Sequence, residues 1–407
     1  MRILLVTHFL PYPPSDGGRI GYYNPIKYLS GRHEIILLSL ARPDDGANIS
    51  ALRSMCTDVV TLVDRGWTAG RVMRGVFGSP PGTAGKYASN EFREVFERAT
   101  KKYRPDIIEL EHLNTAWLLA HCDRSCPVIL REHNIEFKVW ERQAEHTANP
   151  VARIALNLQA GRVRKFEADM AARFDHCITV SEADKTYLQR VSPRAVITAI
   201  PSGVDTEYFC PMPEVVEVPF SMVMTGSFGW RPKQHNLRVV LSEIFPRIHA
   251  RLPEAVLTIV GKGVPPHLSQ LAEKHGVTVT GAVPDVRPYI SSASLIINYL
   301  ESGGGIALKV LEAMAMRKPV LTNALGVEGI SLQPGRDAEV VKSIDEFAEA
   351  AQRLLIDGNR RSALAENGYA FVKGEYSWRK LAGRFEALYR QSLSESRSSV
   401  MKRACGT

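Results

Sequence analysis

The sequence has few cysteines and no apolar run long enough to cross a membrane. Its six cysteines are scattered. Only Cys122 and Cys126 lie close together, and no second pair of cysteines or histidines completes a zinc-binding pattern. We therefore expect no metal and no disulfide. The apolar start of the chain ends at His8, which is too early for the core of a signal peptide. These absences favour a cytoplasmic protein.

A chain of 407 residues is too long for one compact core and fits two domains. The composition, 45% hydrophobic and 23% charged, is typical of a globular protein. A turn at Pro201 and a proline-rich stretch after Cys210 predict a hinge. We expect a first domain at residues 1–205 and a second domain at residues 206–379.

The net charge of +8 is unevenly distributed. Residues 1–205 hold 27 basic against 23 acidic side chains, residues 206–379 hold 18 of each, and residues 380–407 hold six against two. An excess of positive charge in the first domain and the tail fits an anionic partner, either a membrane surface or a phosphate-bearing acceptor. A generic basic surface is the alternative, and no feature suggests a nucleic-acid partner.

Residues 65–79 combine three arginines with Trp67, Met73, Phe77 and two valines. A basic segment with aromatic side chains can lie on a membrane interface. We favour the other interpretation, in which these side chains pack beneath a surface loop.

The chain begins with a strand at Arg2–Thr7, a helix preceded by glycines, and a strand at Glu34–Leu40, a βαβ pattern that predicts a parallel sheet. Gly17 and Gly18 open that helix, and a helix N-terminus attracts anions. The GxGxxG dinucleotide fingerprint is absent. The second half repeats the pattern, with helices expected at 236–250 and from Trp378 to about Ser392.

Polar clusters follow two strands of the first half. Glu111 and His112 come after one strand, and His133 and Glu136 come after the next. Because ligands bind beyond the carboxyl ends of parallel strands, we expect the two histidines to share one cleft.

The stretch Glu301–Thr322 carries the clearest binding signal. Gly303, Gly304 and Gly305 leave a strand and enter a helix, where the free N–H groups can hold a diphosphate. Lys309 and Glu312 follow on one face of that helix, and the carboxylate suits sugar hydroxyls. This pattern indicates a nucleotide-sugar site, and an ordinary glycine turn is the alternative.

Arg231 and Lys233 follow the first strand of the second half. Placed at a strand end, they could pair with phosphate oxygens as cationic clamps, and plain surface charge is the alternative.

Several motifs spread along the chain together resemble the group 1 family of retaining, metal-independent nucleotide-sugar glycosyltransferases, which have the GT-B fold. They are PYPPSDGGR, the REHN segment ending at Asn134, VSEAD, IPSGVDTEYF, VPDVRPYI and LKVLEAMAMRKPVLT. The resemblance implies an α/β protein with two doubly wound, Rossmann-like domains facing a cleft and a C-terminal helix that crosses back to the first domain.

The resemblance also implies roles for residues. Gly17 and Gly18 would approach a phosphate, and His133 would contact the transferred sugar. The segment Gly303–Leu308, which includes Ile306 and Ala307, would hold the diphosphate together with Lys309, and Glu312 would bind the ribose. Arg231 and Lys233 would neutralise the leaving group, and His112, Glu136 and Glu301 would contact acceptor or sugar.

Three positions depart from the family pattern. Gly304 stands where the first glutamate of the family's motif is expected, a replacement shared by a branch of the family with GGGI before the helix. Tyr299 replaces a proline, and Ser227 replaces a phosphate-binding arginine. Recognition of the donor sugar must therefore differ.

The resemblance predicts transfer of a hexosyl group, with retention, from a UDP- or GDP-linked sugar to a hydroxyl of a glycan or lipid-linked acceptor. No further cofactor is expected. Surface polysaccharide or glycolipid synthesis at the inner face of the cell membrane fits this chemistry. A nucleotide-sugar epimerase on the same scaffold and a non-catalytic nucleotide-sugar-binding subunit are the alternatives.

Overall fold

The computed structural model describes residues 1–64, 66, 68–302 and 306–404, with side chains described as far as Ser396. The chain divides into two compact units. Unit 1 comprises Met1–Pro201 with Leu381–Thr407, and unit 2 comprises Ser202–Lys380. Within the described part of the chain, no helix is both long and apolar enough to cross a membrane.

Unit 1 is built on a parallel sheet with the strand order β3-β2-β1-β4-β5-β6-β7. The order reverses between β1 and β4, which is where a doubly wound sheet places its ligands. The strands are β1 (Arg2–Thr7), β2 (Glu34–Ala41), β3 (Asp58–Val63), β4 (Ile107–Glu111), β5 (Val128–Arg131), β6 (His176–Thr179) and β7 (Ile197–Ala199).

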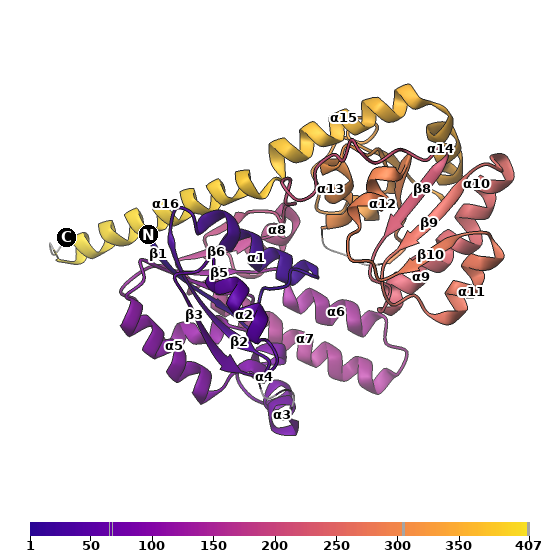
Figure 1. Ribbon diagram of the computed structural model, residues 1–407. Helices are drawn as coiled ribbons and strands as arrows, with labels where there is room; N and C mark the ends of the chain where they lie inside the picture. The colour runs from indigo at the N-terminus through magenta and orange to yellow at the C-terminus, as the bar shows by residue number, and fades with distance from the viewer. Residues whose placement is uncertain (65, 67, 303–305, 405–407) are drawn as a thin grey trace. The chain divides into compact units, whose positions relative to one another are not determined.

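Helices flank this sheet (Figure 1). They are α1 (Gly17–Leu29), α2 (Gly46–Arg53), α3 (Ala69–Phe77), α4 (Gly82–Tyr87), α5 (Asn90–Tyr103), the 3₁₀ helix η1 (Ala116–His121), α6 (Glu136–Glu145), α7 (Pro150–Ala171) and α8 (Glu182–Val191). Because helices cover both faces of a parallel sheet, its strands are continuous apolar runs; β2, for example, is buried at every residue after Glu34.

Unit 2 holds a second parallel sheet, in the order β10-β9-β8-β11-β12-β13. Its strands are β8 (Ser221–Thr225), β9 (Val256–Val260), β10 (Thr278–Gly281), β11 (Leu295–Asn298), β12 (Val320–Asn323) and β13 (Glu339–Val341). Its helices are α9 (Arg231–Val239), the π-helical turn η2 (Val240–Ile244), α10 (Phe245–Arg251), α11 (Pro266–Lys274), α12 (Arg287–Ser292), α13 (Leu308–Ala315), the 3₁₀ helix η3 (Leu325–Val327), α14 (Ile344–Ile356) and α15 (Gly358–Glu375). The expected α/β class is confirmed.

The C-terminal helix α16 (Trp378–Ala404) begins in unit 2 and continues in unit 1 from Leu381. Its end near Ser392 was wrongly predicted, because the residues from Ser392 to Ala404 include no glycine or proline to stop a helix. In unit 1, the guanidinium of Arg384 donates to the carbonyl of Ala199 at 2.7 Å.

The helix expected at 236–250 begins five residues earlier, at Arg231. Proline is favourable in the first turn of a helix, so Pro232 starts this helix rather than preceding it. Arg231 and Lys233 therefore lie in the first turn of α9, after the short loop that follows the end of β8.

The segment after Gly66 was expected to pack beneath a loop, and this was also wrong. Residues Ala69–Phe77 form helix α3, and its larger apolar side chains are exposed, with 73% of the Phe77 surface accessible. The side of α3 that packs against the protein carries Gly75, which is buried.

Candidate active site

Three histidines meet at the carboxyl ends of the strands on either side of the switch point in unit 1. His8 follows β1, His112 follows β4, and His133 comes just after β5. The ring centroids of His112 and His133 are 6.3 Å apart, and those of His8 and His112 are 5.1 Å apart. The expectation that His112 and His133 lie together is confirmed, while His8 was not predicted.

His133 is fixed by a buried ion-pair network. Its Nε2 lies 2.7 Å from Oε2 of Glu111, whose other oxygen accepts from Nη1 of Arg131 at 3.3 Å. Burial, Arg131 and His112 lower the pKa of His133 well below its ordinary value. The imidazole is therefore neutral at pH 7 and donates its Nε2–H to the Glu111 carboxylate. The sequence places Glu111 in the polar cluster with His112, but its partner His133 follows another strand, and only the fold brings the two together.

Two side chains of helix α16 contact this network. The hydroxyl of Tyr389 donates to Glu109 at 2.6 Å, and the guanidinium of Arg131 lies over the ring of Phe385. Burial and the neighbouring Glu111 raise the pKa of Glu109 to about 8. Burial raises the pKa of Glu111 as well, but Arg131 and the hydrogen bond with Glu109 lower it, so Glu111 is the one of the two carboxyl groups that carries the negative charge.

The space beside His133 depends on Gly21 of α1. A Cβ atom at this position would lie 2.8 Å from Cε1 and 3.0 Å from Nδ1 of the imidazole. The carbonyl of Gly21 also accepts from Arg131 at 2.8 Å. Only a glycine leaves room for this arrangement. Sequence reasoning singled out Gly17 and Gly18 and missed Gly21.

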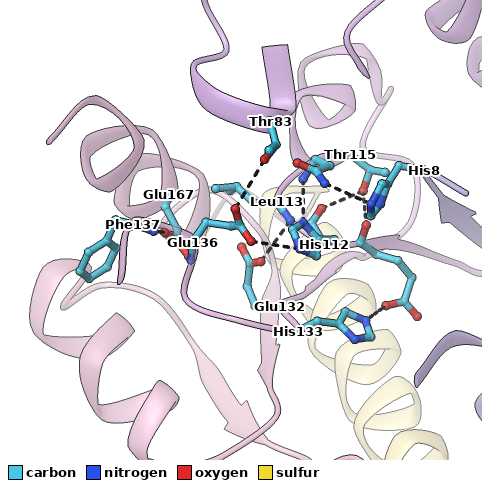
Figure 2. A network of polar contacts seen from close by, with 12 residues as sticks. His8, Thr83, His112, Leu113, Thr115, Glu132, His133, Glu136, Phe137 and Glu167 are labelled. Carbon is cyan, nitrogen blue, oxygen red and sulfur yellow. Dashed lines mark hydrogen bonds and ion pairs between the residues drawn. The ribbon is translucent and has the colours of Figure 1, made fainter. Parts of the chain in front are cut away.

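His112 has a strained backbone, with a φ of 72°. Side chains rarely adopt this left-handed conformation, and it tends to persist where a side chain must point in one direction. Its Nε2 lies 3.2 Å from Oε1 of Glu136, so these two expected contacts are indeed together. Figure 2 shows this pair beside Glu132 and Glu167.

Two buried glutamates hold the loops around this pair. Glu132 accepts from the backbone N–H of Leu113 at 3.1 Å and so joins the ends of β4 and β5. Glu167 of α7 accepts from the N–H groups of Glu136 and Phe137 at 2.9 and 3.0 Å, which caps the start of α6. Burial raises the pKa of Glu167 to about 8.

His8 is buried and hydrogen-bonded to the amide of Asn114, with a separation of 3.1 Å. Burial and the two other histidines lower its pKa well below the ordinary value. Gly17 and Gly18 open α1 nearby in sequence, and Asp16 caps the helix by accepting from the N–H of Arg19. A Cβ atom at Gly17 would meet no atom within 4 Å, so this position lies in open space.

In unit 2, the predicted diphosphate loop leaves the end of β11, at the switch point between β8 and β11. Gly303, Gly304 and Gly305 lie outside the described residues. The residues just before them are held by Asn236, whose Oδ1 accepts from the N–H groups of Glu301 and Ser302 at 2.9 and 3.2 Å and whose Nδ2 donates to the carbonyl of Ser302. Asn236 was not predicted, because its role depends on α9 lying beside this loop.

Helix α13 carries the predicted nucleotide-binding pair. Burial and the charge of Lys233 lower the pKa of Lys309 to about 8, and burial raises the pKa of Glu312 to about 7. Because the charge of Lys233 in α9 acts on Lys309 in α13, the two cationic side chains lie near each other. These charges are partly covered by protein, as expected for groups that meet a ligand.

The other residues expected to bind the donor are placed around the start of α13. Ile306 and Ala307 precede the helix, and the N–H of Leu308 donates to the carbonyl of Ile306 at 2.9 Å. This N–H is therefore already hydrogen-bonded within the chain. Glu301 accepts from Nε2 of His235 at 2.8 Å, so this expected sugar contact is already hydrogen-bonded to a side chain of α9.

Models of glycosyltransferase families match both halves of the chain. A model of "Glycosyltransferase Family 4" matches residues 17–208, and one of "Glycosyl transferases group 1" matches residues 219–357. A GDP-mannose-dependent alpha-(1-6)-phosphatidylinositol monomannoside mannosyltransferase of Mycobacterium tuberculosis is 29% identical over 227 residues. That alignment covers 49% of this chain and only 57% of the mannosyltransferase.

Two solved structures have the same fold along nearly their whole length. Sucrose-phosphate synthase from Thermosynechococcus elongatus has a TM-score of 0.69 at 19% identity, covering 97% of this chain and all of that one. Anabaena HepE in complex with UDP and glucose has a TM-score of 0.67 at 15% identity, covering 96% of this chain and all of that one. The fold is the GT-B fold. With both halves matched in order, the chain belongs to the group 1 family of glycosyltransferases.

Proposed function

We propose that this protein transfers a hexosyl group from a nucleotide diphosphate sugar to a hydroxyl of a glycan or lipid-linked acceptor, with retention of configuration and without a metal. In this proposal residues 206–379 bind the donor, and residues 1–205 with 380–407 form the acceptor side. Surface polysaccharide or glycolipid synthesis is the setting that fits such a reaction.

The observation that carries the proposal is the charge arrangement on α9 and α13. Burial and the charge of Lys233 lower the pKa of Lys309, and Glu312 lies one turn after Lys309. Two cations suit a diphosphate, and a carboxylate suits the paired hydroxyls of a ribose. The glycines that precede α13 in the sequence would add backbone N–H groups.

These groups would stabilise the leaving diphosphate. As the glycosidic bond breaks, negative charge builds up on the phosphate oxygen, and Lys233, Arg231 and the start of α13 would neutralise it in place of a metal ion. The leaving phosphate oxygen would then take the proton of the acceptor hydroxyl on the same face of the sugar, which gives retention. No side-chain nucleophile is required in this scheme.

In unit 1, the neutral state of His133 supports a role beside the sugar. A charged imidazolium would repel the oxocarbenium-like transition state, whereas a neutral ring held by Glu111 would not. We propose that His133 contacts the transferred sugar, and that His112 and Glu136 contact acceptor or sugar. Gly17 and Gly18 would admit a phosphate close to the backbone.

The donor is proposed to be UDP- or GDP-linked. The name of the mannosyltransferase above specifies GDP-mannose, and HepE was solved with UDP and glucose. The phosphatidylinositol mannoside in the former name is a lipid, which supports a lipid-linked acceptor for this chain. We also propose that the protein works at the inner face of the cell membrane as a peripheral protein.

The test begins with calorimetric titration of UDP and GDP. Wild-type protein should bind one of them, and Glu312→Ala should lower that affinity by about 100-fold, because the ribose hydroxyls lose a buried carboxylate partner. Unchanged affinity in Glu312→Ala would refute the donor site. Incubation of radiolabelled donor with membrane lipid extract should then label a lipid; a new free nucleotide sugar would indicate an epimerase, and binding without turnover a non-catalytic subunit.

A further inference from the structure

Helix α3 packs with its small side against the protein and its large apolar side outward. Gly75 is buried, and a Cβ atom there would lie 2.4 Å from the carbonyl oxygen of Gly82 in α4. On the opposite side Met73 and Phe77, four residues apart, are 55% and 73% exposed. Helices on a protein surface normally bury their apolar side. This reversed orientation leaves an apolar face that the protein itself does not cover.

A second apolar stripe lies on α7. Val151, Ile154 and Leu158 are all more than 60% exposed, and their spacing places them on one face of the helix. We call the seven exposed apolar side chains of the two helices the outward face: Val72, Met73, Val76, Phe77, Val151, Ile154 and Leu158. They are seven of the seventeen large apolar side chains exposed in the described part of the chain. Their concentration on two helices distinguishes them from scattered surface residues.

The two stripes adjoin. Arg162 lies one turn after Leu158 on the same side of α7, and its guanidinium donates to the carbonyls of Val76 and, at 2.6 Å, Gly78 at the end of α3. Gln159 donates to the carbonyl of Gly75 at 2.8 Å. Side chains of α7 thus cap the C-terminus of α3, and Figure 1 shows α3 next to α7. These hydrogen bonds join the C-terminal end of α3 to α7 next to Leu158, the last residue of the α7 stripe.

The sequence around the outward face is predominantly basic, and one of its arginines, Arg71, pairs with Asp64 at 2.7 Å. Residues 65–87 contain four lysines or arginines, residues 146–166 contain another four, and neither stretch contains an aspartate or glutamate. Arg153, Arg164 and Lys165 of α7 are exposed. Apolar side chains bordered by basic ones suit the surface of a lipid bilayer, in which anionic headgroups lie over apolar acyl chains. A nucleic acid would satisfy the charges and leave the apolar side chains in water.

We propose that the outward face docks on the anionic surface of a lipid bilayer. Its apolar side chains would enter the boundary between headgroups and acyl chains, and the neighbouring basic side chains would meet lipid phosphates. This inference gives a specific location to the membrane association proposed above and rests on that proposed function for the lipid-linked acceptor. A face of this kind lies on the membrane rather than spanning it.

Vesicle flotation tests the proposal. Full-length protein is mixed with vesicles of phosphatidylcholine alone or with added phosphatidylglycerol, and the fraction that floats is measured. Wild-type protein should float with the anionic vesicles. The double variants Met73→Ser/Phe77→Ser and Ile154→Ser/Leu158→Ser should bind them at least about tenfold more weakly, because each loses buried apolar area in the bilayer. Arg153→Gln/Lys165→Gln should lose about fivefold for each charge at low salt.

The matched control is Ile356→Ser, since Ile356 of α14 in unit 2 is 62% exposed, as Ile154 is 61% exposed. This control should float as the wild type does, and circular dichroism checks that every variant is folded. The proposal is wrong if wild-type protein does not float with anionic vesicles, or if the variants of the outward face float as well as the control. Calorimetric binding of UDP or GDP by the same proteins tests the proposed function separately, because exposed side chains of α3 and α7 should not affect it.

Discussion

Nε2 of His133 lies 2.7 Å from Oε2 of Glu111, and both side chains are removed from water. This hydrogen bond fixes the ring orientation and the tautomer of the imidazole. Arg131 balances the charge of Glu111, and the residues of α16 cover Arg131. The candidate sugar contact is thus positioned by residues from three separate parts of the chain.

The position of His133 can be tested through Gly21. Gly21→Ala places a methyl group 2.8 Å from Cε1 of His133, so the ring must move. We expect the kcat of sugar transfer to fall by about 10- to 100-fold, with nucleotide affinity unchanged. Gly31→Ala is the control, since a Cβ atom there meets nothing within 4 Å. Equal activities of the two variants would refute the role of His133.

Arg131→Met should reduce the free energy of unfolding by about 3–5 kcal/mol near pH 8, because it leaves the buried Glu111 carboxylate without its cation. The loss should be smaller near pH 5, where Glu111 can take up a proton. Denaturant unfolding measures both values. Arg124→Met, which breaks a partly exposed pair with Asp175, should cost about 1 kcal/mol or less. Similar costs for both variants would contradict the buried network.

Nucleotide affinity should depend on pH through Glu312 and Lys309. Below about pH 7 Glu312 takes up a proton and loses its acceptor strength, and above about pH 8 Lys309 loses the charge that attracts a diphosphate. We expect the tightest binding between these values, measured by calorimetry at about pH 6, 7.5 and 9. Glu312→Gln should remove the decline on the acid side and keep the decline on the alkaline side. A flat profile in the wild type would show that neither group binds the nucleotide.

Stability should depend on pH through Glu109. Its pKa is raised from an ordinary value of 4.5 to about 8, so in this window the folded protein holds a proton that the unfolded chain has released. The contribution of Glu109 to stability is complete below about pH 4.5 and is lost as the pH rises to about 8. Relative to Glu109→Gln, the wild type should therefore lose about 4 kcal/mol across this range in denaturant unfolding. Glu91→Gln, at the exposed start of α5, should show no such difference.

Asn236→Ala should loosen the start of the diphosphate loop, because three hydrogen bonds to residues 301 and 302 are lost. We expect nucleotide affinity to fall by about tenfold and the free energy of unfolding to fall by about 1–3 kcal/mol. Asn157→Ala, at an exposed position of α7, is the control for both measurements. If Asn236→Ala loses stability and keeps its affinity, the asparagine supports the fold alone.

Much of the fold could be predicted from local patterns. Strands such as β2 are apolar runs that the sequence shows directly. The predicted start of α9 was wrong because a proline can either precede a helix or occupy its first turn, and Pro232 lies in the first turn. The prediction for α3 was also wrong, because amphipathic spacing could not reveal which side faces the protein.

The sequence by itself determined the α/β class, the place of His112 and His133 at strand ends, and the Lys309–Glu312 spacing on α13, because these follow from residue order and helical or strand periodicity. Only the tertiary structure decided which groups surround them. Glu111, Gly21, Asn236 and Tyr389 act through contacts between distant segments, and burial in those contacts sets the pKa of Glu109 and the neutrality of His133. Burial and long-range pairing depend on how elements pack, which no local pattern specifies.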